Sequence, residues 1–343
     1  MDQVTTKAVP TGAQPAAPRP PSSGPGGLPG NIFRYVLATS AVHQGILVVL
    51  TVAIFLIELV PLELQRRIVN DLTKHRDFSF ILTLCAIYGV VVLMHGIGKL
   101  TLNVYRGWVG ERATRDLRQR IHGVAGASQA AAASADARGI EVSMIVAEVE
   151  PVGAFAGACV SEPLLQGGVL LSASAYMIHL DPWMALTAAV IFVPQLIFVP
   201  ILQGAIVRRS ADRVQVLRGL GASIVAADDD GAKDAPADDA RIERAFELDM
   251  GIFKLKFSMN FLMNFCNHLQ IIAALLLGGW FVLMHQFEIG GVVAFISAVA
   301  RLNDPWGDLV NYFRDLSVTN VKFRLLATAV DQLAQDEVPT AVA

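Results

Sequence analysis

Arg301, Asp304 and Asp308 stand out chemically because they interrupt an otherwise apolar stretch, Ile289–Phe313. On a helix, residues three and four positions apart lie near one face, and these three residues have that spacing. Pro305 lies between the two acids and should kink such a helix and free a carbonyl group. Ionisable groups at membrane depth cost about 2.5–3.5 kcal/mol each, so they usually serve a function. We therefore predict a polar substrate path here. The alternative is an ion pair within this one helix, buried in the bundle and without substrate contact.

Other charged residues lie in separate apolar stretches. Glu58, in the stretch Ala41–Leu64, faces either the same path or the outer membrane interface. His95 and Lys99 are four positions apart and could meet these acids across a helix bundle. Lys99 could instead extend its stem toward the lipid headgroups, which we favour. Glu162 is expected to be a polar partner between helices.

Other kinds of chemistry find no support in the sequence. The three cysteines, Cys85, Cys159 and Cys266, lie in apolar stretches without metal-ligand spacing. The acidic run 228–239 lacks ligands at the first and last positions of an EF-hand. The sequence contains no phosphate-binding G-x-x-x-x-G-K-[ST] loop, and no Ser/His/Asp set is discernible. We therefore expect no metal, no catalysis and no ATP hydrolysis in this chain. The net charge of −3 gives no reason to expect a nucleic-acid partner.

Composition predicts the elements that position these residues. Of the 343 residues, 54% are hydrophobic and only 17% are charged, whereas about a quarter of a soluble domain is charged. A membrane span needs about 20 mostly apolar residues. Six stretches qualify: Ala41–Leu64, Phe78–Leu102, Val152–Leu180, Trp183–Val207, Ser258–Met284 and Ile289–Phe313. The sequence predicts an all-α membrane protein with six long transmembrane helices.

The two ends of the sequence are predicted to lie outside this domain. Residues 1–30 are rich in Pro, Gly, Ala and Ser and cannot bury enough apolar surface to order themselves. We expect a disordered cytosolic tail there, a transmembrane domain over 31–333, and a flexible tail over 334–343.

The basic residues predict which side of the membrane each connector occupies. Spans 2 and 3 are joined by 103–151 and spans 4 and 5 by 208–257, whereas the other connectors are short. Both long connectors are rich in Arg and Lys. The opposite side carries only Arg66, Arg67, Lys74 and Arg76. By the positive-inside rule we expect the long connectors and both termini in the cytoplasm, with the protein in the inner cell membrane.

The long connectors are predicted to continue the spans as helices. An apolar stripe recurs at every fourth position, with charges between its members: Val109, Ala113, Leu117 and Ile121. One helix from Phe78 to Val124 would be about 70 Å long, whereas a bilayer with its headgroups is about 45 Å thick. We expect similar cytosolic extensions at 140–152, 207–225 and 239–257. Paired helices that project from a membrane on one side are typical of a device that transmits force.

Three stretches resemble the transmembrane domain of ABC exporters. Val109–Arg118 (VGERATRDLR) is similar to the stretch where span 2 of that family reaches the cytosol. Residues 139–150 (GIEVSMIVAEVE) resemble the segment that opens span 3. Gly290–Phe295 (GGVVAF), with Arg301 and Pro305 after it, resembles the start of span 6. The similarity covers Asn31–Leu333.

This resemblance implies a six-helix half-transporter. It would assemble as a homodimer or with a paralogous permease subunit, driven by a separate ABC ATPase subunit that binds ATP and Mg²⁺. The resemblance also implies segments that couple to the ATPase, the second of them a short helix at Gln215–Gly221. Their residues would be Ala132, Ala133, Gly139, Arg218 and Gly219. The chain departs from the family where Ala132-Ala133-Ser134 replaces a Phe-Phe-Asp-like triplet.

Two other functions fit the same sequence. One is an ion-coupled secondary carrier with Asp304, Asp308 and Glu58 as the coupling acids. The other is a membrane scaffold that descends from an exporter and no longer transports. The sequence does not indicate which substrate an exporter would move.

Overall fold

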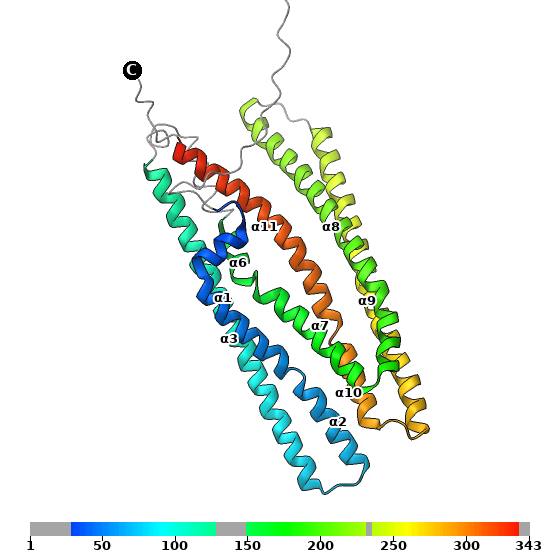
Figure 1. Cartoon of the computed structure of the whole chain (residues 1–343). Coiled ribbons are helices and arrows are strands. Elements are labelled where there is room, and N and C mark those ends of the chain that lie inside the picture. Colours follow the sequence, from blue (N-terminus) through cyan, green and yellow to red (C-terminus); the bar gives the residue numbers. More distant parts are fainter. Residues whose placement is uncertain (1–28, 128–148, 231–234, 336–343) are drawn as a thin grey trace, which may run out of the picture.

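The computed structural model describes residues 29–127, 149–230 and 235–335 (Figure 1). The helices in these ranges are α1 (Ile32–Ile57), α2 (Val60–Thr73), α3 (Phe78–Ala127), α6 (Val149–Ala158), α7 (Ser161–Leu180), α8 (Pro182–Asp230), α9 (Ala235–Leu283), α10 (Ile289–Ala300) and α11 (Asn303–Gln335). No strand occurs in the described ranges. The predicted all-α fold class is therefore confirmed.

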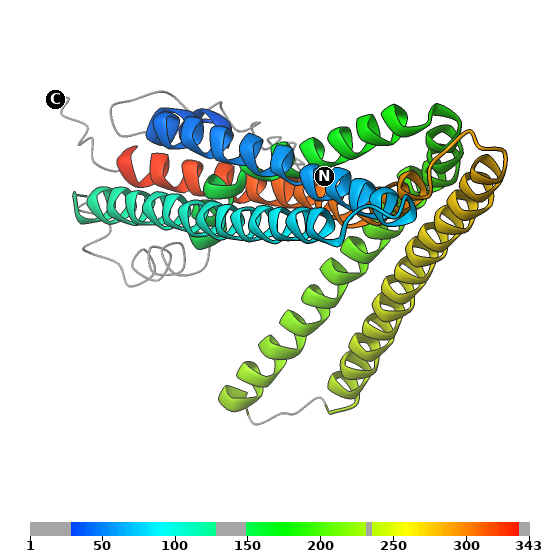
Figure 2. The same cartoon turned by 90° about the horizontal axis from the view of Figure 1, so that it is seen from below.

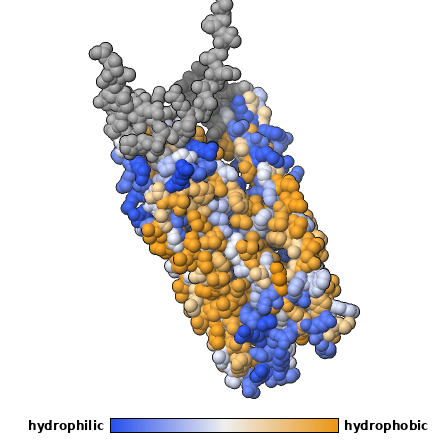
Figure 3. Space-filling view, in the orientation of Figure 1, coloured by the Kyte–Doolittle hydropathy of each residue, from blue (hydrophilic) through white to orange (hydrophobic). Residues whose placement is uncertain are grey.

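Five helical segments of the described residues are long and apolar enough to cross a membrane. They are Ile32–Thr73, Phe78–Gly123, Val149–Leu180, Pro182–Leu217 and Pro236–Leu283. Figure 3 shows apolar side chains around the middle of the molecule and hydrophilic side chains at both ends. The chain thus has the architecture of a multi-pass membrane protein.

The sixth predicted span, Ile289–Phe313, consists of two helices. α10 ends at Ala300 and α11 begins at Asn303. α10 has 12 residues, too few to cross the hydrocarbon core, which needs about 20. The count of six spans therefore remains a prediction.

Prolines explain three interruptions in the predicted spans. Each break lies about four residues before a proline: Ile57 precedes Pro61, Cys159 precedes Pro163 and Arg301 precedes Pro305. Proline has no N–H to donate to the carbonyl four residues earlier, and its ring clashes with that carbonyl. The freed groups find other partners. The hydroxyl of Tyr312, for example, donates to the carbonyl oxygen of Cys159 at 2.6 Å.

Three helices are much longer than a bilayer is thick. α3 has 50 residues, and α8 and α9 have 49 each. At 1.5 Å per residue each is about 75 Å long, against about 45 Å for a bilayer with headgroups. The predicted extensions of spans 2, 4 and 5 are confirmed as helices. Most of the extension predicted at 140–152 lies outside the described residues.

All of these extensions point toward the same end of the molecule. The end of α3, the end of α8 and the start of α9 lie there, beside the start of α1 and the end of α11 (Figure 1). We call it the connector end. The opposite end, the turn end, holds the short turns at 74–77, 181 and 284–288.

The helices pack differently at the two ends. At the connector end Ala113, Leu117 and Ile121 of the predicted stripe are buried in a cluster with residues of α1, α6 and α11. α8 and α9 form a hairpin that diverges from this cluster at the connector end (Figure 2). Toward the turn end, α8 contacts α7 and α9 contacts α10. The long hairpin is therefore attached to the bundle mainly through its turn-end half.

Small residues allow α3 and α6 to approach closely, which gives a first prediction. A Cβ added at Gly153 of α6 would lie 1.9 Å from Oγ1 of Thr114 on α3. We expect Gly153→Val to destabilise the protein by about 2 kcal/mol, because backbone must move to admit the side chain. Gly107→Ala on α3 is the control, since a Cβ there meets no atom within 4 Å. Thermal denaturation of the purified protein measures both. Equal midpoints for the two variants would contradict this packing.

Candidate functional site

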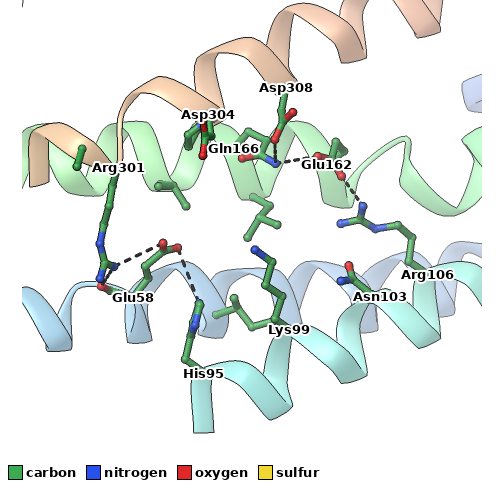
Figure 4. Close-up of a pocket in the computed structure, with 15 residues that line it drawn as sticks. Glu58, His95, Lys99, Asn103, Arg106, Glu162, Gln166, Arg301, Asp304 and Asp308 are labelled. Carbon is green, nitrogen blue, oxygen red and sulfur yellow. Dashed lines mark hydrogen bonds and ion pairs between the residues drawn. The ribbon is translucent and has the colours of Figure 1, made fainter. Parts of the chain in front are cut away.

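A polar cavity of about 400 Å³ lies among α1, α3, α7 and the α10–α11 break (Figure 4). Four carboxylates line it: Glu58, Glu162, Asp304 and Asp308. Three permanent cations and one histidine also line it: Lys99, Arg106, Arg301 and His95. All four residues that the sequence assigned to a substrate path, Glu58, Arg301, Asp304 and Asp308, meet in this cavity.

One face of α3 supplies most of the cationic wall. His95, Lys99, Asn103 and Arg106 follow one another at intervals of three and four residues and line the cavity together. This spacing places the four side chains above one another along a helix. The opposite face of the same helix segment is apolar and exposed, with Leu93 63% and Leu100 63% exposed. α3 thus has an apolar face on the outside of the bundle and a polar face toward the cavity.

At the end of the cavity nearest the turn end, Arg301 joins the two broken helices. Its Nη1 donates to the backbone carbonyl of Glu58 at 2.6 Å and lies 3.5 Å from the Glu58 carboxylate. Nε2 of His95 lies 3.9 Å from the other oxygen of the same carboxylate. Since Leu62 N–H bonds to Leu59, the break in α1–α2 leaves the Glu58 carbonyl available. We call Glu58, His95 and Arg301 the hinge cluster.

A second group of polar residues lies toward the connector end. Arg106 of α3 forms an ion pair with Glu162 of α7. Nε2 of Gln166 donates to Glu162 at 2.8 Å and to Asp308 of α11 at 3.1 Å. We call Arg106, Glu162, Gln166 and Asp308 the α7 cluster. It links three helices across the cavity (Figure 4).

Beyond the hinge cluster, α2 and α10 close the turn end. Oδ1 of Asn70 accepts from the Gly290 N–H at 2.8 Å, and its amide donates to Glu288. Lys74 Nζ lies 2.7 Å from the same carboxylate. A Cβ at Gly290 would lie 2.2 Å from the carbonyl oxygen of Arg66, so only glycine permits this approach. The cavity therefore extends from the hinge cluster toward the connector end.

Aromatic side chains indicate where α3 leaves the bilayer. The rings of Tyr105 and Trp108 stack with centroids 5.8 Å apart, and the Arg112 guanidinium lies 5.4 Å from the Trp108 ring. Tyr and Trp favour the membrane interface. The helix from Phe78 to Trp108 is about 45 Å long, the thickness of a bilayer with headgroups. A bilayer that spans this stretch of α3 would contain Lys99 and the cavity.

Two sequence expectations about the charged residues require correction. Arg301 pairs with Glu58, which lies 243 residues earlier in the chain, and not with an acid of its own helix. Lys99, which we expected to extend toward the headgroups, lines the cavity. Both contacts depend on how neighbouring helices pack, and the residue pattern of one helix does not reveal that packing.

The sequence analysis also missed part of the site. Arg106 was assigned to a cytosolic connector, and Gln166 and Asn103 were not considered. The available signal was spacing, since Arg106 continues the helical face of Lys99 and His95. Glu162, expected to be a partner between helices, does form such a contact, with Arg106.

The coupling segments implied by the resemblance are only partly visible. Ala132, Ala133 and Gly139 lie outside the described residues. Arg218 and Gly219 lie within α8, which continues without interruption to Asp230. Gln215–Gly221 is therefore part of a long helix and not a separate short one. Its role in coupling remains a prediction.

In the described residues no group of three or more His, Cys, Asp or Glu side chains is arranged to hold a metal ion. The cavity instead combines fixed ion pairs with uncompensated charges, an arrangement suited to binding a polar molecule. Comparison with models of known protein families gave no match, and comparison with curated proteins gave none either.

Proposed function

We propose that this chain is the membrane-spanning permease subunit of an ABC-type exporter, and that a separate ATPase subunit powers it. The observation that carries this proposal is the length of α3, α8 and α9, which have 50, 49 and 49 residues. Each continues about 30 Å beyond the thickness of a bilayer with headgroups, and all three do so at one end. Rigid helices of this kind can pass a movement outside the membrane to the spans.

The cavity supports alternating access as the mechanism. It extends from the hinge cluster toward the connector end, which the positive-inside rule places in the cytosol. A substrate would enter from the cytosol and be held in front of the hinge cluster. Closure of the ATPase subunits would then move α8 and α9, separate Arg301 from Glu58, and open the path between α2 and α10.

A second copy of the chain, or a paralogous permease, would complete the transporter. Large apolar side chains lie exposed along one face of α9, including Ile242 (53%), Phe246 (58%) and Phe253 (49%). The helix from Leu283 to Phe253 already covers about 45 Å, so Ile242 and Phe246 lie beyond the bilayer. Burial of each such side chain contributes about 1.5–3 kcal/mol, which favours a helical partner on this face.

This pairing gives a second prediction. Phe246→Glu should weaken self-association at least tenfold, because it places a charge in an apolar interface. Glu247→Gln on the neighbouring exposed position serves as the control. Mass photometry of protein in nanodiscs measures the fraction of dimers. An unchanged dimer fraction in Phe246→Glu, together with an unchanged thermal midpoint, would show that this face of α9 is not part of the interface.

Co-purification with an ATPase tests the proposed function. Tagged protein isolated from its own cells under mild detergent should retain an ABC ATPase subunit. The complex reconstituted in liposomes should hydrolyse ATP faster when its substrate is present. If no ATPase associates and ATP turnover never responds to the membrane subunit, the exporter proposal fails.

One observation favours a second candidate, an ion-coupled carrier. Asp304 and Asp308 both line the cavity, where carboxylates could carry protons or sodium ions. Such a carrier would drive transport from a pH or sodium gradient in liposomes that contain this chain alone. The exporter would show no gradient-driven transport under these conditions.

A further inference from the structure

Three polar side chains of the cavity have no partner in the part of the chain that the structure describes. Among the described residues, Lys99, Asn103 and Asp304 form no hydrogen bond or ion pair, although all three line the cavity. The other charged side chains there are engaged in the hinge cluster and the α7 cluster. A charge at membrane depth costs free energy unless something compensates it. These three groups are therefore the ones available to a ligand.

The available groups lie on two opposite walls. Lys99 and Asn103 belong to α3, and Figure 4 shows the Lys99 ammonium pointing into the space between the helices. Asp304 belongs to α11 on the other side, with Asp308 one turn further along. Within the described residues, the side chain of Asp308 accepts one hydrogen bond, from Gln166. One wall thus presents donors and a positive charge, and the other presents carboxylates.

From these two walls we infer that the cavity binds a small amino-acid-like molecule, with a carboxylate at Lys99 and Asn103 and an ammonium group at Asp304. A carboxylate accepts hydrogen bonds from both an ammonium and an amide, and an ammonium donates to a carboxylate. This substrate class rests on the proposed function, because it assigns the cavity to the transported molecule.

The net charge of the cavity favours a ligand with a second positive group. Four carboxylates line it against three permanent cations, so one negative charge is left over when His95 is neutral. Asp308 lies beside Asp304 and can receive this second group. A basic amino acid, with two ammonium groups and one carboxylate, matches the pattern. An acidic molecule would place its extra charge against Asp304 and Asp308.

The size and lining of the cavity agree with such a ligand. Its volume of about 400 Å³ falls at the lower end of the range for small-molecule sites, about 300–1,000 Å³. Ile54, Leu165 and Val169 provide a limited apolar contact for a short aliphatic chain. A molecule whose surface is mostly hydrocarbon would leave the charged walls without compensation.

Binding to the purified chain tests this inference without an ATPase. The probes are L-lysine, cadaverine, which lacks the carboxylate, and glutarate, which lacks both amines. Titration calorimetry in nanodiscs should show lysine binding about tenfold more tightly than cadaverine, and no binding of glutarate. Lys99→Met should reduce lysine affinity about tenfold and leave cadaverine affinity unchanged or higher. Asp304→Asn should weaken both amines.

Lys256→Met is the matched control, because Lys256 lies on α9 outside the cavity, and thermal midpoints verify that each variant folds. The inference is overturned if no probe binds at millimolar concentration, if glutarate binds as well as lysine, or if Lys99→Met leaves the preference for lysine over cadaverine unchanged. Loss of ATP-driven transport would count against the exporter proposal alone, since this binding measurement uses no ATP.

Discussion

Replacing Arg301 by Met is expected to destabilise the protein by about 3 kcal/mol and to reduce transport more than tenfold. Arg301 holds the carbonyl and the carboxylate of Glu58, at 2.6 and 3.5 Å. Removal of one member of a buried pair leaves the other charged and unpaired, which costs about 3–5 kcal/mol. Because Arg301 and Glu58 are only partly buried, the lower end of this range is expected. Thermal denaturation in nanodiscs and uptake into inside-out vesicles measure the two effects.

Because Arg301 and Glu58 contact each other, the stability effect of replacing Arg301 should depend on whether Glu58 is present. Glu58→Gln should cost less than Arg301→Met, because Arg301 keeps its bond to the Glu58 backbone. The double variant should be destabilised by less than the sum of the two single variants, by at least about 1 kcal/mol, since the two residues interact. Arg314→Met on α11, whose ion pair is with its neighbour Asp315, should change stability by less than about 0.5 kcal/mol. Strict additivity of the Glu58 and Arg301 effects would disprove the bridge.

The second large effect is expected for the Arg106–Glu162 ion pair. Removing its positive member should destabilise the protein more than removing its negative member. Arg106→Met leaves Glu162 unpaired near Asp308 and raises the excess negative charge of the cavity. Glu162→Gln removes one carboxylate and leaves Arg106 with Asp308 nearby. We therefore expect Arg106→Met to destabilise the protein by about 3 kcal/mol and Glu162→Gln by about 1 kcal/mol.

Both variants are measured in the same nanodiscs at one salt concentration and one pH, so solution conditions do not contribute to the difference between them. Arg115→Met, on the exposed part of α3 beyond the bilayer, controls for the loss of one arginine. If Glu162→Gln were as damaging as Arg106→Met, or more so, electrostatic balance would not be what holds the α7 cluster together.

The long helices could be predicted from the sequence because their signal is local. The stripe of Ala113, Leu117 and Ile121 repeats at the helical period, and no proline interrupts α3 after Phe78. Two prolines inside α8, Pro194 and Pro200, did not prevent a continuous helix. Length and periodicity were therefore enough to place the extensions, and the predicted end of α3 at Val124 lies close to the observed Ala127.

Breaks and pairings depended on information that the pattern lacks. The kink at Pro305 follows from the chemistry of proline and was expected. Similar breaks before Pro61 and Pro163 obey the same rule, but the sequence alone does not distinguish them from the tolerated prolines of α8. The partner of Arg301 is set by the packing of α2 against α10, which brings the α1–α2 break beside the α10–α11 break. That contact joins residues far apart in the chain, and no local spacing encodes it.

The arrangement of the site explains why the breaks matter for function. The breaks before Pro61 and Pro305 meet at the hinge cluster, where Arg301 joins them. Beyond them α2 and α10 pack against each other and are held by Asn70 and Glu288. Under the proposed mechanism these two short helices would move together, with the hinge cluster as the contact that opens and closes.

Accessibility of a cysteine at Asn103 tests the central claim of ATP-driven alternating access most directly. Asn103→Cys is introduced after Cys85, Cys159 and Cys266 have been replaced by Ser or Ala. In the complex with its ATPase, a membrane-impermeant maleimide should label position 103 from the cytosolic side without nucleotide. With trapped ATP it should label that position from the outer side. Labelling that is identical with and without nucleotide, or that comes from the outer side in both cases, would contradict the account.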